Sequence, residues 1–434
     1  MRALYTFLWY LALPWLPLRL WWRGRRERGY RERIGERFGA YRGAVRAPVL
    51  WVHAVSLGET RAAAPLVERI RRAHPDATVL LTHMTATGRA AGRALFGDGV
   101  VQAWLPYDVP FAVRAFLRHF RPQAGMIVET ELWPNLIALA AEAGVPLYLV
   151  NGRLSERSAK GYARVRALAQ PMLASFAGIA AQSAADAARF GALGARAPVV
   201  TGNLKFDLEI PAAALALGRE LRLRCGEERP VWVAGSTRDG EEALILDALG
   251  RGALPAATLT VIVPRHPQRF DAVALLLRQR GIPFVRRSDN MPVPADVGVM
   301  LGDSMGEMLG YYAAADVAFV GGSLVPLGGQ NLIEPIALAR PTLIGAHTFN
   351  FAEATANALA AGAARRVEDA DALIAAVGAL LADRGQRLAM GQAALAFHAV
   401  HRGAGDRLWQ WLAPQLDAAA GGAAGARVSP PAGG

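Results

Sequence analysis

Three acidic side chains, Glu59, Glu129 and Glu131, follow apolar runs at points where strands would end. Glu59 closes the segment Ser56-Leu57-Gly58-Glu59, in which Gly58 permits a tight turn before a helix. In the first turn of that helix, the helix dipole favours the ionised carboxylate, and an ionised carboxylate can act as a general base toward an alcohol. The same position equally suits a carboxylate that only caps the helix.

The other two acids leave an apolar run that ends at Val128, in the segment Glu129-Thr130-Glu131-Leu132-Trp133-Pro134-Asn135. Paired carboxylates beside an aromatic side chain suggest contacts with sugar hydroxyls or with a transition state. The alternative is that both are ordinary loop acids near the start of a helix.

Lys205 is unusual because the chain uses arginine almost throughout, and its only other lysine is Lys160. It lies in the segment Gly202-Asn203-Leu204-Lys205-Phe206-Asp207. A compact ammonium group there can face a carboxylate or a phosphate. An exposed surface lysine is the alternative.

Turns containing glycine or proline follow apolar runs in the second half of the chain. Glycine turns that open helices present backbone N–H groups and a positive dipole end to phosphate, and Glu334 can accept hydrogen bonds from ribose hydroxyls. Glycine also permits bare tight turns, but the recurrence indicates a nucleotide site. The turns are Gly235-Ser236-Thr237, Pro264-Arg265-His266-Pro267, Gly302-Asp303-Ser304-Met305-Gly306-Glu307, Gly321-Gly322-Ser323 and Gly328-Gly329-Gln330-Asn331-Leu332-Ile333-Glu334-Pro335.

These residues require an α/β scaffold, because strand-length apolar runs alternate with helical periods along the chain. Parallel sheets place ligands at the carboxyl ends of their strands. In the first half the expected strands are Val49–Val55, Thr78–Thr82, Val100–Trp104, Gly125–Val128, Leu147–Val150, Gly178–Ala181 and Val199–Val200. In the second half they are Val231–Ala234, Thr258–Val263, Phe284–Arg286, Val297–Leu301, Val317–Val320 and Thr342–Ile344.

A length of 434 residues favours two domains. We expect a first domain over 31–207 and a second over 208–412, which ends in a helical region that begins at Leu388. The Ala/Gly-rich tail 413–434 is expected to be disordered.

The N-terminal segment 1–30 is expected to be a membrane anchor with a basic collar. Ala3–Leu18 carries no charge and spans about 24 Å as a helix, slightly short of a bilayer core. The arginines that follow suit the cytoplasmic side and anionic head groups. Spanning and interfacial placement both remain open because Pro14 and Pro17 bend or end a helix. A signal peptide and a buried core helix are the alternatives. We expect deletion of residues 1–22 to weaken membrane association more than it damages the catalytic domains.

Composition and missing motifs exclude several classes of protein. The single cysteine, Cys225, excludes an internal disulfide framework, and the scattered histidines give no support to a metal site. A net charge of +12 suggests anionic partners, but the arginine clusters lack the aromatic interleaving of a nucleic-acid surface. Neither a Walker phosphate loop nor a Gly-x-Gly-x-x-Gly motif is present.

Taken together, the motifs resemble the 3-deoxy-D-manno-octulosonic acid (Kdo) transferases of lipopolysaccharide assembly. The likeness rests on the Ser56, Glu129, Gly202, Pro264, Gly302, Gly321 and Asn331 segments quoted above and on His347-Thr348-Phe349-Asn350-Phe351. Their order and spacing extend from the apolar N-terminus to about Leu412. Only the Ala/Gly tail lies outside the likeness.

The resemblance implies a GT-B fold, with two Rossmann-like domains facing a cleft, and an inverting transfer of Kdo from CMP-Kdo to lipid IVA. It implies work at the cytoplasmic face of the inner membrane, with no bound metal or cofactor. Glu59 then matches the general base, while Glu129 and Lys205 match positions that stabilise the transition state. We assign Ser56, Gly58 and Glu131 to the acceptor. The expected donor residues are Ser236, Pro264, Arg265, Met305, Gly306, Glu307, Asn331, Leu332, Ile333 and Glu334.

Two other functions remain open beside this one. Another GT-B enzyme, such as a nucleotide-sugar epimerase or a peptidoglycan glycosyltransferase, would share the architecture. A catalytically silent membrane-associated relative would share it as well, since fold alone does not assign function. The number of Kdo residues transferred does not follow from these motifs.

Overall fold

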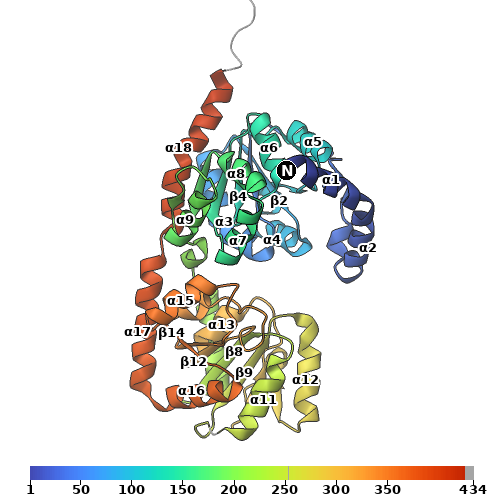
Figure 1. Cartoon of the computed structure of the whole chain (residues 1–434). Coiled ribbons are helices and arrows are strands. Elements are labelled where there is room, and N and C mark those ends of the chain that lie inside the picture. The colour runs from blue at the N-terminus through green and yellow to red at the C-terminus, as the bar shows by residue number, and fades with distance from the viewer. Residues whose placement is uncertain (253, 426–434) are drawn as a thin grey trace, which may run out of the picture. The chain divides into compact units, whose positions relative to one another are not determined.

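The computed structural model describes residues 1–252 and 254–425, which form two compact units (Figure 1). Of the described residues, the first unit comprises 1–207 together with 403–425, and the second comprises those between 208 and 402. Each unit contains one parallel β-sheet covered by helices on both faces, so the predicted α/β architecture with two parallel-sheet domains is confirmed.

The first unit is built on a parallel sheet of strand order β3-β2-β1-β4-β5-β6-β7. Its strands are β1 Val49–His53, β2 Thr78–His83, β3 Val101–Trp104, β4 Ala124–Val128, β5 Leu147–Gly152, β6 Gly178–Ala181 and β7 Val199–Val200. Its α-helices are α1 Arg2–Ala12, α2 Leu16–Arg26, α3 Leu57–Ala73, α4 Ala86–Phe96, α5 Pro110–Phe120, α6 Pro134–Glu142, α7 Glu156–Arg164, α8 Arg166–Ala174, α9 Ala184–Ala192 and α18 Ala404–Gly425. Short 3-10 helices are η1 Leu13–Trp15, η2 Arg28–Arg31, η3 Ile34–Phe38, η4 Gly97–Gly99 and η5 Leu204–Asp207.

Alternation along the strands divides the core of this unit into two layers. In β1, Val49 and Trp51 face one cluster, while Leu50 and Val52 face the other. The side-chain period of two along a strand produces this division. Helices pack on both sides, so the strands read as nearly continuous apolar runs, as expected for a buried parallel sheet.

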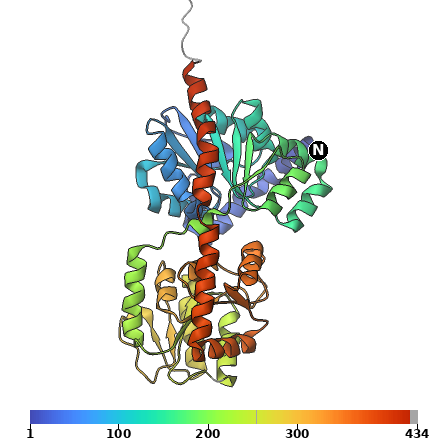
Figure 2. The ribbon, with the colours of Figure 1, turned by 90° about the vertical axis from the view of Figure 1, so that its left-hand side faces the viewer.

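Helix α18 returns the chain to the first unit, and Figure 2 shows it lying along that unit. Leu408, Leu412 and Leu416 are fully buried in one of its core clusters. The Asp207 carboxylate accepts hydrogen bonds from the Gly403 N–H at 2.6 Å and the Ala404 N–H at 3.2 Å, at the start of α18. This differs from the expected boundary at 412, and residues 413–425 are helical rather than disordered. Residues 426–434 lie outside the described part of the chain.

The second unit has a parallel sheet of strand order β10-β11-β9-β8-β12-β13-β14. Its strands are β8 Val231–Thr237, β9 Leu259–Pro264, β10 Phe284–Arg286, β11 Val299–Leu301, β12 Val317–Val320, β13 Thr342–Ile344 and β14 Ala364–Arg366. Its α-helices are α10 Ala212–Cys225, α11 Glu241–Arg251, α12 Phe270–Gln279, α13 Met308–Ala314, α14 Ile333–Ala337, α15 Ala352–Ala360, α16 Ala370–Ala382 and α17 Arg384–His401, and its 3-10 helices are η6 Pro267–Arg269 and η7 Arg287–Asp289. Sequence patterning missed only β14 among these strands, because its Ala-Arg-Arg sequence is neither apolar nor alternating.

The N-terminal segment forms two short helices, α1 and α2, separated by the η1 turn that contains Pro14. No helix within residues 1–252 and 254–425 is both long and apolar enough to cross a membrane. A helix that spans the bilayer, one of the two placements left open by the sequence, is therefore not found in the described chain. Large apolar side chains on this segment are nevertheless exposed, among them Leu8, Leu11 and Trp15.

Candidate active site

The predicted acidic residues of the first unit meet at one point of its sheet. Strands β1 and β4 are neighbours, and the strand order runs in opposite directions on either side of them. In open parallel sheets, ligands bind beyond the carboxyl ends of the strands at such a point. Glu59 follows β1, and Glu129 and Glu131 follow β4, which puts all three at this end of the two strands.

Glu59 lies in the first turn of α3 and is fixed by hydrogen bonds to the preceding loop. The Ser56 side chain caps the helix, and its hydroxyl lies 3.2 Å from Glu59 Oε1. The Val55 N–H donates to Glu59 Oε2 at 2.6 Å. Glu59 is thus part of the helix cap, as the alternative interpretation predicted. The same hydrogen bonds hold its carboxylate in one orientation, and the residue stays partly exposed.

The surroundings of Glu59 favour its protonated form more than water does. Burial and then the charge of Glu129 raise the pKa of Glu59 to about 7, and Glu131 adds to the rise. Hydrogen bonds from Val55 and Ser56 act in the opposite direction. A carboxyl group with a pKa near the working pH is suited to accept a proton in a reaction, because both protonation states are accessible.

Gly58 has a role different from the expected one. It is the second residue of α3, and its φ is not in the left-handed region, so it does not form a tight turn. A Cβ atom at this position would meet nothing closer than Ser56 Oγ at 3.9 Å. The glycine therefore leaves open space beside Glu59, which allows a ligand to approach the backbone closely.

The loop that precedes α3 is held in place by the start of α4 and by η3. Thr85 binds the Val55 carbonyl through its N–H at 3.1 Å and its hydroxyl at 2.8 Å. The buried Arg37 donates to the Met84 carbonyl at 3.1 Å and lies 3.9 Å from the centre of a Trp104 ring. These contacts restrict the loop that orients Glu59.

Glu129 adopts a backbone conformation that is uncommon for a residue with a side chain. Its φ is +62°, in the left-handed region, directly after β4. Its carboxylate forms an ion pair with Lys205 at 2.7 Å, and both side chains are mostly buried. Strained backbone is frequently found at functional sites, where the surrounding structure maintains it. Burial raises the pKa of the neighbouring Glu131, and the charge of Glu129 adds to the rise.

Asn151, which the sequence analysis did not select, helps to position Lys205. Its φ is +52°, and its side-chain oxygen accepts a hydrogen bond from the Leu204 N–H at 3.0 Å, at the start of η5. Lys205 N–H in turn donates to Asn203 Oδ1 at 3.0 Å. The signal in the sequence was Asn151-Gly152 at the end of an apolar run, since asparagine tolerates the left-handed region better than most residues.

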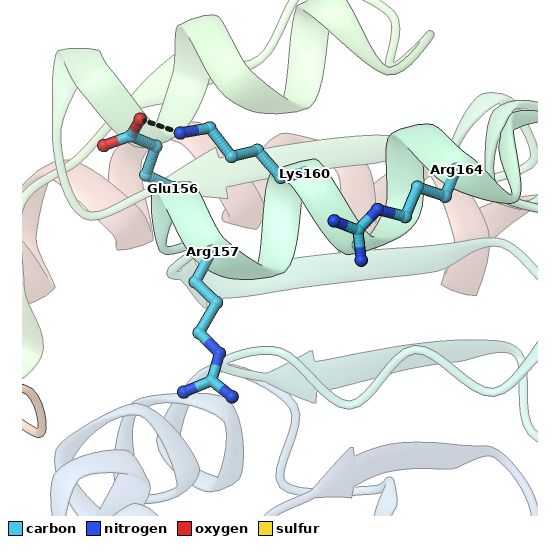
Figure 3. A pocket seen from close by; sticks show the side chains of 5 residues that line it. Glu156, Arg157, Lys160 and Arg164 are labelled. Carbon is cyan, nitrogen blue, oxygen red and sulfur yellow. Dashed lines mark ion pairs between the residues drawn. The ribbon is translucent and has the colours of Figure 1, made fainter.

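The other lysine has a local partner on the surface. Lys160 of α7 pairs with Glu156 at 2.7 Å, one helical turn away, and both side chains are more than two-thirds exposed. Together with Arg157, Gly161 and Arg164 they line a surface pocket along α7 (Figure 3). None of the predicted site residues lines this pocket, so the two lysines have different surroundings.

Two histidines near Glu59 are structural. His53 and His83 are fully buried, and burial lowers their pKa values to about 3 and about 4. His53 Nδ1 lies 2.9 Å from the Thr82 hydroxyl, and His83 Nδ1 lies 2.9 Å from the Ala54 carbonyl oxygen. Neither is exposed, so neither can accept a proton from a substrate in this structure.

In the second unit, the predicted donor residues gather at the carboxyl ends of four neighbouring strands, β11, β9, β8 and β12. Ser236, with φ of +57°, is at the end of β8, and the remaining residues follow in the adjoining loops. They are Pro264 and Arg265 after β9, Met305, Gly306 and Glu307 after β11, and Asn331, Leu332, Ile333 and Glu334 at the start of α14.

Several of these donor residues are tied together by hydrogen bonds. The Glu307 carboxylate accepts from Ser304 Oγ at 2.6 Å and pairs with Arg287 at 3.2 Å. Asn331 Nδ2 donates to Glu334 Oε1 at 3.2 Å. Leu332 and Ile333 are fully buried, so neither offers its side chain to a ligand in this structure.

The Gly321-Gly322-Ser323 turn does not present its N–H groups to a ligand as expected. The buried Glu241 carboxylate accepts hydrogen bonds from the N–H groups of Gly322, Ser323 and Leu324 at 2.5 to 3.0 Å, and from Arg238 at 2.8 Å. An internal carboxylate therefore occupies the place predicted for phosphate. Glu241 lacked a signal in the sequence because three of its four partners lie more than eighty residues further along the chain.

Comparisons with known proteins agree with the resemblance seen in the motifs. A sequence model of the 3-deoxy-D-manno-octulosonic-acid transferase (kdotransferase) family matches residues 32–208. The 3-deoxy-D-manno-octulosonic acid transferase of Bordetella pertussis is 45% identical over 95% of this chain and 99% of its own length. The enzyme of the same name from Haemophilus influenzae is 39% identical, over 89% of this chain and 92% of its own.

A solved structure supports the fold separately. The crystal structure of Anabaena Alr3699/HepE in complex with UDP matches 86% of this chain and 100% of its own, at 15% identity and a TM-score of 0.57. That likeness establishes two Rossmann-like domains of GT-B type. The fold, together with the identity to two transferases over nearly the whole chain, leads to one conclusion: this protein belongs to the 3-deoxy-D-manno-octulosonic acid transferase family and is a glycosyltransferase.

Proposed function

We propose that the protein transfers Kdo from CMP-Kdo to lipid IVA with inversion at the anomeric carbon, using Glu59 as the general base. One observation carries the proposal. Glu59 is oriented by two hydrogen bonds at the switch point of the first sheet, and burial and Glu129 raise its pKa to about 7. Such a carboxyl group is suited to take a proton from a sugar hydroxyl at neutral pH.

In the proposed reaction, a lipid IVA hydroxyl oxygen attacks the anomeric carbon of Kdo in a single displacement. The bond between that carbon and the CMP phosphate oxygen breaks, the hydroxyl proton passes to Glu59, and CMP leaves with the bonding electrons. One displacement inverts the anomeric centre, so one base is sufficient. Lys205 and Glu129, whose Nζ and Oε1 atoms are 2.7 Å apart, supply fixed charges near the reacting groups.

Donor binding is assigned to the second unit, at the carboxyl ends of β8, β9, β11 and β12. Arg265 follows β9 directly and offers a guanidinium group for the phosphate. The Asn331–Glu334 hydrogen bond presents a carboxylate at the start of α14, where ribose hydroxyls can donate to it. Since Gly322 and Ser323 donate to Glu241, the phosphate must be bound by other groups.

The acyl chains of the proposed acceptor lie in a membrane, and an enzyme that acts on it would use an exposed apolar surface to reach that membrane. We place α1 and α2 in the interface of the inner membrane, at its cytoplasmic face. Trp15, Leu18 and Trp22 are 58–71% exposed, and arginines follow them along α2. Apolar side chains beside basic ones suit a surface that contains anionic lipid.

The test is incubation of the purified full chain with CMP-Kdo and lipid IVA in detergent micelles, followed by mass spectrometry of the lipid. We expect the lipid mass to rise by one or more Kdo units with release of CMP, and the spectrum also counts the sugars added. A lipid that stays unmodified, with a protein that CMP does not stabilise against thermal unfolding, would reject this donor and acceptor. Stabilisation by UDP but not by CMP would point to another nucleotide sugar.

A further inference from the structure

Helix α1 has two faces with different surroundings. Leu4, Phe7, Leu8 and Leu11 are 54–57% exposed on one face. Tyr5, Thr6 and Trp9 lie on the other face and are partly buried against the first unit. The spacing of three and four residues separates the two sets around the helix. The exposed face suits a membrane interface, whereas the inner face packs against the first unit at α6 and the residue before it.

The inner face of α1 contacts the end of the segment that carries Glu129 and Glu131. The Thr6 hydroxyl donates to Asn135 Oδ1 at 2.9 Å, although these residues are far apart in the sequence. The Trp9 ring lies 6.2 Å from the Trp133 ring, centre to centre. Asn135 is 2% exposed, so its side-chain oxygen depends on protein partners.

Asp108 connects the same helix to the same segment by a second route. Its carboxylate accepts hydrogen bonds from the N–H groups of Asn135 at 2.9 Å and Leu136 at 2.7 Å, at the start of α6. Tyr5 lies close enough to lower the pKa of this carboxyl group. Asp108 is 2% exposed, and burial raises its pKa to about 6. Thr6 therefore contacts Asn135 directly, and the neighbouring Tyr5 lies near Asp108, which fixes the same start of α6.

The start of α6 determines where the acidic segment ends. Trp133 is the N-cap residue of α6, it follows Glu131 by two residues, and its partly buried side chain packs against the core of the first unit. Glu129, at the other end of the segment, is held in its left-handed conformation next to Lys205. A short segment with both ends fixed has little freedom, and a displacement of about 1 Å can cost about a hundredfold in rate.

We propose that α1 is a positioning element of the active site: through Thr6 and Trp9 it holds Asn135 and Trp133, and through them the carboxylates of Glu129 and Glu131. The inference rests on the proposed function for its kinetic consequence. It changes the expectation for deletion of residues 1–22, which should reduce transfer even where membrane association is irrelevant.

The experiment uses full-length protein in detergent micelles, so that membrane partitioning does not limit the rate. Thr6→Val removes the hydroxyl that donates to Asn135, Thr6→Ser restores it, and Trp9→Leu removes the ring contact. Arg2→Gln is the matched control, because Arg2 also joins α1 to α6, but through an exposed ion pair with Glu142 at the far end of α6. Transfer kinetics and hydrogen–deuterium exchange of residues 129–136 are measured for each variant.

We expect Thr6→Val and Trp9→Leu to lower kcat about tenfold with the KM for CMP-Kdo unchanged. Exchange over residues 129–136 should become faster in both variants, and Thr6→Ser and Arg2→Gln should match the wild type. A kcat within twofold of the wild type and unchanged exchange in both variants would overturn the proposal. If the wild type transfers no Kdo, the proposed function fails, and the exchange data still decide whether α1 positions the segment.

Discussion

The turn before α3 in the first unit and the turn before α11 in the second place a glutamate in the same kind of position, with different results. Glu59 accepts one backbone N–H and remains partly exposed. Glu241 accepts four backbone N–H groups and is fully buried. A carboxylate at the start of a helix can therefore take part in catalysis or hold a loop in place. In these two cases, the number of backbone N–H groups that donate to the carboxylate distinguishes the two roles.

The neighbours of the two carboxylates explain their different acidity. Around Glu59 the other acids Glu129 and Glu131 add to the effect of burial, and the pKa rises to about 7. Burial also raises the pKa of Glu241, but the surrounding N–H groups oppose the rise. We interpret Glu59 as a group that exchanges protons and Glu241 as a fixed acceptor that holds a loop.

Substitution of Glu59 should have the largest effect. Glu59→Gln keeps a hydrogen-bond acceptor for Val55 but cannot take a proton, so the transfer rate should fall by about two to four orders of magnitude. CMP should still stabilise the variant against thermal unfolding, because the donor residues lie in the second unit. Glu68→Gln, in the same helix, is the control, since Glu68 pairs only with Arg71 among the ion pairs of the described chain. Near-normal transfer by Glu59→Gln would remove Glu59 from the role of base.

The two lysines allow a matched test of the charges around Glu59. Lys205→Met should lower transfer by about a hundredfold, because it removes a fixed cation from the site. It also leaves Glu129 without its ion-pair partner beside Glu59, which should shift the rising limb of the pH–rate profile to higher pH. Lys160→Met removes an exposed pair with Glu156 and should leave the rate unchanged. Equal rates for the two variants would contradict the assignment.

Glu241→Gln tests the architectural side of the comparison. The amide N–H₂ group would face backbone N–H groups that now donate to a carboxylate, which costs on the order of 1–3 kcal/mol for each group left unpaired. We expect a lower melting temperature, measured by calorimetry, because the 321–324 loop loses its internal acceptor. Glu220→Gln, which affects a pair with Arg224 in which Glu220 is half exposed, is the control. An unchanged melting temperature of Glu241→Gln would contradict the architectural role of Glu241.

The dependence of stability on pH should show the smallest effect. A carboxyl group with a raised pKa in the folded state stabilises the protein at low pH, and this contribution is lost as pH rises through the folded value. For Glu59 the loss should run from about pH 4.5 to above 7. Glu59→Gln should therefore raise the melting temperature by a few degrees at pH 8 and by less at pH 5. An equal shift at both values would contradict the raised pKa.

Local patterns in the sequence predicted most strands and the loops that follow them. The strand ends beside Glu59, Glu129 and Ser236 could be predicted because apolar runs stop there and polar or glycine residues begin. Residues that act at short range, such as Ser56 as a helix cap, were visible for the same reason.

Features that depend on distant contacts were not predictable in this way. Glu241 looked like any helix-start acid, because three of its four partners come from the loop after β12. Leu408 and Leu412 belong to an ordinary apolar stripe of a helix. The sequence of that stripe does not predict that it packs on the first unit. The contacts of the inner face of α1 could not be predicted, because the apolar composition of this helix is typical of a membrane anchor. In each case the missing information is which surfaces meet.

The most direct test of the account is the pH dependence of single-turnover transfer at saturating CMP-Kdo and lipid IVA, compared between the wild type and Glu59→Gln. The wild-type rate should rise tenfold per pH unit at low pH and level off above an apparent pKa near 7, because only the ionised carboxylate accepts a proton. The residual rate of Glu59→Gln should lack this limb. A wild-type profile without an ionisation near pH 7, or the same limb in Glu59→Gln, would contradict the account.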